Sequence, residues 1–166
     1  MIIQTISPQD IDLFYPIFSS VLKSEFPGYT SEVVHYLLDR IYTKETLKYW
    51  AQRKEKIIFG AYEKDSIVGF AVIDGPYGGV SFCRWLGVLK THQHTGFGTA
   101  LIQKWNDLAC ESNAHKMEVA GQPEAKEFYE KMGFHLEGLR KASYFGIDQY
   151  LFGKVIGSPN VAVMTK

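Results

Sequence analysis

VSFCRWLGVLKTHQHTGFGTALIQKW, residues 80–105, predicts an apolar strand, a short polar loop and an amphipathic helix in direct succession. The loop ends at Gly96 and Gly98, and the helix that follows carries Leu101 and Trp105 on its inner side. Where a strand leads through a glycine loop into a helix, backbone N–H groups can point at an anion. The segment therefore predicts a site for a ligand that carries phosphate.

The rest of the chain alternates strand and helix patterns, which predicts an α/β fold with helices flanking a central sheet. Hairpins at 56–74 and 134–156 make that sheet mixed and mostly antiparallel rather than fully parallel. We expect strands at 2–6, 56–63, 66–74, 80–89, 115–120, 134–144 and 148–156, and helices at 8–23, 31–41, 44–50, 99–111 and 123–132.

Several helix ends are marked by residues that suit a cap. A hydroxyl residue precedes each of three apolar helical patterns: Ser7, either Thr30 or Ser31, and Thr43. The hydroxyl oxygen of such a residue can accept a bond from an N–H of the first turn. Gly133 follows the last predicted helix, where a left-handed backbone commonly ends a helix.

Composition and charge exclude several classes of function. Lys plus Arg and Asp plus Glu number 18 each, so no net charge draws the chain to nucleic acid or to an anionic membrane. The 166 residues are 46% hydrophobic, and we expect one domain over 1–166 with a flexible tail at 157–166. No signal peptide or bilayer-spanning run is visible, so a cytoplasmic location is expected. Cys83 and Cys110 lack the spacing of a paired motif.

Three phosphate-binding motifs compete at the glycine loop. A nucleoside-triphosphate loop needs a lysine after its last glycine, but Gly98 is followed by Thr99. A dinucleotide fingerprint needs a third glycine where Leu101 stands. The remaining match is Gln93-x-x-Gly96-x-Gly98, which resembles the diphosphate-binding signature of the GNAT acetyltransferases. A tight turn that needs a positive φ is the alternative explanation of the glycines.

A second motif supports the same family. The segment Ala125-Lys-Glu-Phe-Tyr-Glu-Lys-Met-Gly-Phe134 is similar to the family's Asn-x-x-Ala-x-x-Phe-Tyr-x-Lys-x-Gly-Phe segment, and the element order matches from about residue 2 to residue 156. Gln122 stands where the family often has the asparagine, and the retained amide implies a bond to the pantetheine arm. The resemblance implies the acyl-CoA N-acyltransferase fold, acetyl-CoA as acetyl donor, no metal, and dimers, which are common in the family. It implies a set of acetyl-CoA-binding residues: Leu86, Gly87, Val88, Gln93, His94, Thr95, Gly96, Phe97, Gly98, Thr99 and Gln122.

The loop departs from the family in charge. Many members have basic residues there, whereas Gln93, His94 and Thr95 leave this loop neutral. Affinity for the donor should then depend on backbone N–H groups and on Lys90 or Lys126, while the Gln93 side chain offers one amide donor.

Transfer of an acetyl group to an amine benefits from an acid and a base. Tyr129 matches the tyrosine that acts as general acid in many members, and a phenol with a pKa of about 10 is protonated at neutral pH. A packing role is the alternative for Tyr129. Glu118 is similar to the base of the ribosomal-protein N-terminal acetyltransferases; an exposed strand carboxylate, with water removing the proton, is its alternative.

The sequence therefore predicts an N-acetyltransferase that moves the acetyl group of acetyl-CoA directly to a small-molecule or peptide amine in a ternary complex. A non-catalytic acetyl-CoA sensor or scaffold is the second hypothesis, and a structural domain is the third. His92-x-His94 has no further ligand at metal-binding spacing, so two imidazoles exposed in a loop are the preferred interpretation.

Overall fold

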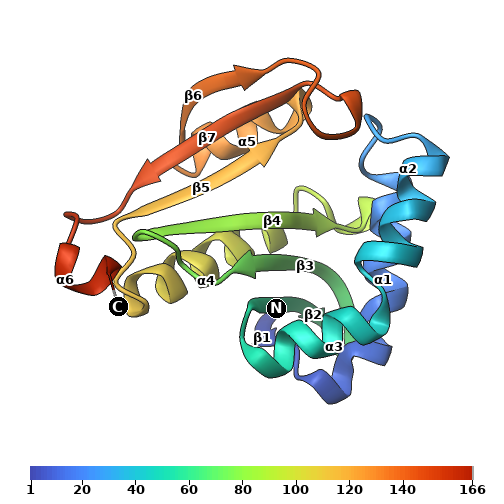
Figure 1. The fold of residues 1–166 in the computed structure, drawn as a ribbon. Coiled ribbons are helices and arrows are strands. Elements are labelled where there is room, and N and C mark those ends of the chain that lie inside the picture. The colour runs from blue at the N-terminus through green and yellow to red at the C-terminus, as the bar shows by residue number, and fades with distance from the viewer. Residues whose placement is uncertain (166) are drawn as a thin grey trace. The chain divides into compact units, whose positions relative to one another are not determined.

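The strands form one seven-stranded sheet in the order β1-β2-β3-β4-β5-β7-β6 in the computed structural model, which describes residues 1–165 (Figure 1). The elements are β1 (Ile2–Thr5), η1 (Pro8–Asp10), α1 (Ile11–Ser24), α2 (Ser31–Tyr36), η2 (Leu37–Ile41), α3 (Lys44–Arg53), β2 (Lys56–Glu63), β3 (Ser66–Asp74), β4 (Val80–Val88), η3 (Lys90–His92), α4 (Phe97–Glu111), β5 (Lys116–Gly121), η4 (Pro123–Ala125), α5 (Lys126–Lys131), β6 (His135–Arg140), η5 (Tyr144–Gly146), β7 (Gln149–Val155) and α6 (Val161–Met164).

The sheet is mixed, as predicted. β1 pairs antiparallel with β2, β4 pairs parallel with β5, and β7 pairs antiparallel with both β5 and β6. The fold-class prediction of an α/β protein with a mostly antiparallel sheet is therefore confirmed. The chain divides into two compact units, one of Met1–Val72 with Trp85–Leu101, the other of residues 73–84 with the described residues from 102 onward.

Aromatic packing builds the core of the first unit. Helix α1 buries Phe14 and Phe18 on one face because they are four residues apart, about one helical turn. Both rings lie against Phe70 of β3, with centroids 5.4 Å and 5.3 Å away. The Trp85 ring of β4 contacts Phe18 at 6.3 Å. This core joins α1 to β3 and to β4, the strand that leads into the glycine loop.

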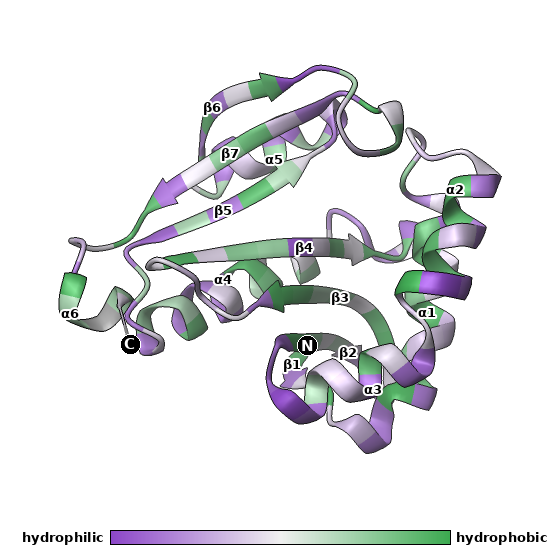
Figure 2. Cartoon of the chain, viewed as in Figure 1, coloured by the Kyte–Doolittle hydropathy of each residue, from purple (hydrophilic) through white to green (hydrophobic). Residues whose placement is uncertain are grey.

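Strand β3 is buried on both faces. Every residue from Ile67 to Ile73 is buried, and Figure 2 shows this strand largely in the hydrophobic colour, whereas α3 is mostly hydrophilic. A strand without polar alternation indicates cover on both sides of the sheet. None of the helices formed by the described residues combines the length and the apolar character needed to span a bilayer.

The predicted caps differ in outcome. Thr30 and Thr43 cap α2 and α3 by accepting bonds from Val33 N–H and Thr46 N–H. Ser7 is the N-cap residue of η1, a 3-10 turn that precedes α1, but its hydroxyl donates to the Asp10 carboxylate at 2.6 Å instead of accepting a backbone bond. Gly133 has the predicted left-handed backbone, with φ 81°.

Several predicted helices have different windings or bounds. The second half of the helix expected at 31–41 is wound as a π-helix, η2, in which Tyr42 N–H bonds the Leu37 carbonyl. The helix expected at 44–50 continues to Arg53, and the one expected at 123–132 is a 3-10 turn followed by α5.

The second unit is built on β5. Trp105 of α4 stacks on Phe134 with centroids 5.6 Å apart, and its indole N–H donates to the Ser81 hydroxyl of β4 at 2.8 Å. The tail from Gly157, where the sequence predicted no element, contains α6. Residue 166, which ends that predicted tail, lies outside the described residues.

Candidate active site

The glycine loop of the first unit has the backbone that glycine permits. We call residues 90–96 the diphosphate loop, after the ligand that the sequence predicts there; it begins at η3 and ends where α4 starts at Phe97. Gly96 has φ 94°, and a Cβ there would meet only Met1 Cε, at 3.6 Å. Conformation, and not lack of space, therefore requires a glycine at this position. His94 also has a positive φ, 60°, which the sequence did not predict.

The first turn of α4 presents backbone donors next to this loop. The Ala100 N–H bonds the Gly96 carbonyl at 3.0 Å, so the N–H groups of Phe97, Gly98 and Thr99 precede the first bond of the helix ladder. Such N–H groups, together with the helix dipole, favour an anion. The arrangement suits an anion, and the sequence predicted a diphosphate at residues 93–99.

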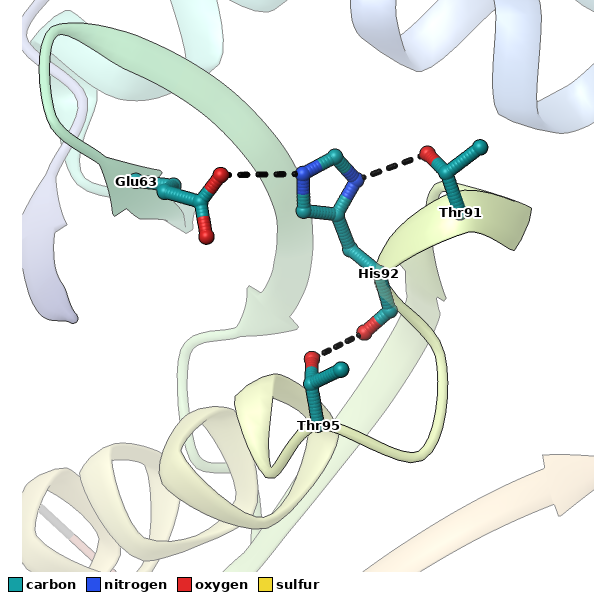
Figure 3. A network of polar contacts seen from close by, with 4 residues as sticks. All are labelled: Glu63, Thr91, His92 and Thr95. Atoms are coloured by element: carbon teal, nitrogen blue, oxygen red, sulfur yellow. Dashed lines mark hydrogen bonds and ion pairs between the residues drawn. The ribbon is translucent and has the colours of Figure 1, made fainter.

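Side chains of the loop form hydrogen bonds with other groups of the protein. The Gln93 side-chain amide donates to the Glu25 carboxylate at 2.8 Å and to the Val88 carbonyl at 3.1 Å. The Thr95 hydroxyl donates to the His92 carbonyl. Figure 3 shows His92 between the Glu63 carboxylate, 3.3 Å from Nε2, and the Thr91 hydroxyl, 2.8 Å from Nδ1.

The end of β4 supplies backbone rather than side chains. The register of β4 with β5 covers Val80–Cys83, so Leu86, Gly87 and Val88 lie beyond that paired segment. Gly87 packs closely in the first unit, since a Cβ there would be 2.5 Å from Val21 Cγ1. The role of these three residues in binding acetyl-CoA stays a prediction, and Gly87 is also needed for packing.

Tyr129 is buried in the second unit. Its side chain is 5% exposed and its ring lies 5.1 Å from that of Phe152 and 5.7 Å from that of Phe134. Burial, with a smaller contribution from Cys83, raises the pKa of the phenol far above its ordinary value. Tyr129 thus holds its proton throughout the physiological range, as a general acid must.

Gln122 has a buried donor. Its side-chain nitrogen is fully buried and has no hydrogen-bond partner among the described residues. A buried N–H without a partner is unfavourable by about 1–3 kcal/mol, so this donor suits a ligand that brings an acceptor. The binding of acetyl-CoA by Gln122, which the resemblance implies, stays a prediction.

Glu118 is engaged elsewhere. Its carboxylate lies 2.8 Å from Lys116 Nζ, which also contacts Glu137 at 2.8 Å, and the two carboxylates raise the pKa of the lysine. Val119 pairs with Phe152, against which Tyr129 packs, so the neighbouring Glu118 points to the opposite sheet face. The structure does not bring the two predicted catalytic side chains together.

Two residues at the loop were not predicted. Glu25 and Glu63 contact it through Gln93 and His92, which are 68 and 29 positions away along the chain. No local pattern could have revealed them, since neither lies in a motif. Within residues 1–165, no three His, Cys, Asp or Glu side chains gather in a way that could hold a metal ion.

A family model supplies the identification. The model, described as an acetyltransferase (GNAT) domain, matches residues 54–136, half of the chain. The chain belongs to the GNAT acetyltransferase family. The matched part of this GNAT protein includes the diphosphate loop, Glu118, Gln122 and Tyr129. A comparison with curated proteins found no match.

Solved structures agree on the fold. The chain is 17% identical to the PaiA N-acetyltransferase from Thermoplasma acidophilum in complex with coenzyme A, with a TM-score of 0.77 over 94% of this chain and 100% of that one. A GNAT acetyltransferase from Streptococcus pneumoniae is 21% identical, with a TM-score of 0.76 over 93% and 99%. The ribosomal-protein-alanine N-acetyltransferase from Brucella melitensis is 16% identical, with a TM-score of 0.73 over 94% and 100%. At these identities the likeness shows the acyl-CoA N-acyltransferase fold.

Proposed function

We propose that this GNAT protein transfers the acetyl group of acetyl-CoA directly to an amine bound beside it, the amine being a small molecule or a peptide. The family match carries the proposal, because it spans both the diphosphate loop and Tyr129. The coenzyme A in the T. acidophilum neighbour supports the choice of donor.

The donor would be held by backbone groups. The N–H groups of Phe97, Gly98 and Thr99 lie in the first turn of α4, where the diphosphate oxygens would bind. Backbone of β4 beyond its register with β5, at Leu86 and Val88, would hold the pantetheine arm and the thioester carbonyl. The buried amide N–H of Gln122 would donate to an oxygen of the same arm.

The chemical step needs one proton given and one removed. The neutral amine attacks the thioester carbon, the carbon–sulfur bond breaks, and Tyr129 donates its phenolic proton to the departing sulfur. The amine loses a proton to Glu118 or, through water, to solvent, and solvent returns a proton to Tyr129. The high pKa of the buried phenol keeps the acid in its protonated form.

A non-catalytic acetyl-CoA sensor is the second candidate. One observation favours it: Glu118 is held by Lys116 and lies on the sheet face opposite the one against which Tyr129 packs. A protein that binds acetyl-CoA without turnover needs no base.

Calorimetry with CoA, combined with thiol release from acetyl-CoA in the presence of a panel of amines, tests the proposal. The panel should hold peptide N-termini, lysine peptides, polyamines, aminoglycosides and amino acids. We expect saturable CoA binding and acetylation of at least one amine class. Binding without turnover on any amine would support the sensor, and absence of binding would refute both candidates.

A further inference from the structure

Two carboxylates contact side chains of the diphosphate loop within the first unit. Glu63 is the last residue of β2, and Glu25 directly follows α1. Carboxylates are unexpected beside a loop that should bind a diphosphate, because like charges repel. Their contacts with loop side chains indicate a different purpose.

His92 is held on several sides. Its Nε2 lies 3.3 Å from Glu63, its Nδ1 lies 2.8 Å from the Thr91 hydroxyl, and its ring meets Phe97 edge to face at 6.0 Å (Figure 3). Its own carbonyl accepts a bond from Thr95. The imidazole therefore connects the loop to β2 and to the first residue of α4.

Gln93 makes the matching connection on the other side. A side-chain amide has two N–H hydrogens. One is directed to Glu25 and the other to the Val88 carbonyl at the end of β4. Since both are used, the Gln93 side chain has no hydrogen left to donate to a diphosphate.

The backbone between these anchors needs support. His94 and Gly96 have φ values of 60° and 94°. Such conformations are unfavourable outside glycine and persist where the surroundings hold them. Apart from Lys90 at its first position, the loop carries no lysine or arginine that could attract phosphate by charge. Affinity for the diphosphate should then depend largely on backbone N–H groups that are already in place.

We propose that His92 and Gln93 are positioning residues that hold the diphosphate loop in its ligand-binding shape. Glu63 acts through His92, and Glu25 acts through Gln93. Neither the His92 nor the Gln93 side chain contacts the donor. This inference rests on the proposed function, because it concerns the same donor site. The inference explains why Glu25 and Glu63 lie next to the loop.

The test compares two probes, CoA and pantetheine, which lacks the diphosphate. We expect His92→Ala and Glu63→Ala each to weaken CoA binding by about threefold to tenfold, the range of one lost hydrogen bond. The double variant should be no worse than either single one, because both remove the same contact. Pantetheine affinity, followed by ligand-observed NMR, should not change.

Conservative variants separate positioning from general damage to the fold. His92→Gln and Glu63→Gln retain hydrogen-bonding groups at both ends of the contact, so CoA affinity should stay close to that of the wild-type protein. Glu55→Ala is the matched control, since it removes an exposed carboxylate just before the other end of β2.

Several outcomes would overturn the inference. Weaker CoA binding in His92→Ala but not in Glu63→Ala would mean that His92 touches the ligand itself. If the variants bound CoA and pantetheine equally more weakly, or if neither affinity changed, His92 and Glu63 would not position the loop. A wild-type protein that binds no CoA would refute the proposed function first, so the two failures are distinguishable.

Discussion

The phenol ring of Tyr129 lies against the backbone of Gly121, where a Cβ atom would be 3.0 Å from Tyr129 Cε2. Phe152 of β7 packs on the same ring, with centroids 5.1 Å apart. Any side chain at position 121 would have to displace one of these rings. The glycine that ends β5 thus determines how closely the phenol approaches the strand.

Tyr129→Phe should lower kcat by about 100-fold, the lower range for a general acid, with little change in the KM for acetyl-CoA. The substitution removes the proton donor and leaves the ring packing intact. Tyr77→Phe is the control, because Tyr77 is 91% exposed in a turn. Steady-state kinetics with the preferred amine measures both, and an unchanged kcat would exclude Tyr129 as the acid.

The pH dependence of the same reaction gives a second check. Burial raises the pKa of Tyr129 above the ordinary tyrosine value of 10.0. Because the acid remains protonated below its own pKa, kcat should show no loss through pH 10 from ionisation of Tyr129. A decline of kcat near that pH in the wild-type protein that disappears in Tyr129→Phe would contradict this expectation.

Glu118 and Glu137 form a matched pair for testing the base. Both carboxylates lie 2.8 Å from Lys116 Nζ, so Gln at either position weakens the same ion pair. If Glu118 is the base, Glu118→Gln should lower kcat by about 100-fold while Glu137→Gln leaves it near the wild-type value. Equal kcat values in the two variants would exclude Glu118 as the base and would indicate that water removes the proton.

Gly96→Ala should weaken CoA binding by about tenfold, because a residue with a Cβ is strained at φ 94° by about 1–3 kcal/mol. Gly138→Ala is the control: a Cβ there meets nothing within 4 Å, and the residue does not have a positive φ. Calorimetry with CoA compares the two variants. Equal affinities would show that the loop does not depend on this backbone conformation.

Ser81→Ala should reduce the free energy of unfolding by about 1–3 kcal/mol, since it leaves a buried N–H without an acceptor. That N–H belongs to Trp105, which is 0% exposed, and Ser81 is 1% exposed. Urea denaturation followed by tryptophan fluorescence measures the change. Ser158→Ala, at an exposed position of the tail, should have no effect.

Asp148 should make the end of the β6–β7 hairpin sensitive to acid. Lys141, and then the Ala142 N–H, lower the pKa of Asp148 below the ordinary 3.8. The stabilisation is therefore complete above pH 3.8 and is lost as the pH falls through the lower native pKa. Protection of the Ala142 N–H from hydrogen exchange should fall in that window, and Asp148→Asn should abolish the pH dependence. The Ser143 N–H, bonded to the Ile147 carbonyl, serves as the internal reference.

Much of the fold was predictable because its signals are local. The bounds of β2 and β3 match the apolar patterns at 56–63 and 66–74, and Thr30 and Thr43 cap as their positions predict. Gly96 has the positive φ that a tight turn, the alternative explanation of the glycines, requires. Each of these depends on spacing within a few residues, which the chain alone specifies.

What surrounds the candidate site depended on contacts between distant parts of the chain. Glu63 and His92 are 29 positions apart, and Glu25 and Gln93 are 68 apart. Lys116 and Glu118 share a face of β5 by simple alternation, but Glu137, the second carboxylate on Lys116, lies 21 positions from it along the chain. Periodicity tells which residues alternate, but only the folded sheet decides which partner each side chain meets. For that reason the sequence could predict a neutral glycine loop, and the tertiary structure alone revealed the two carboxylates that contact it.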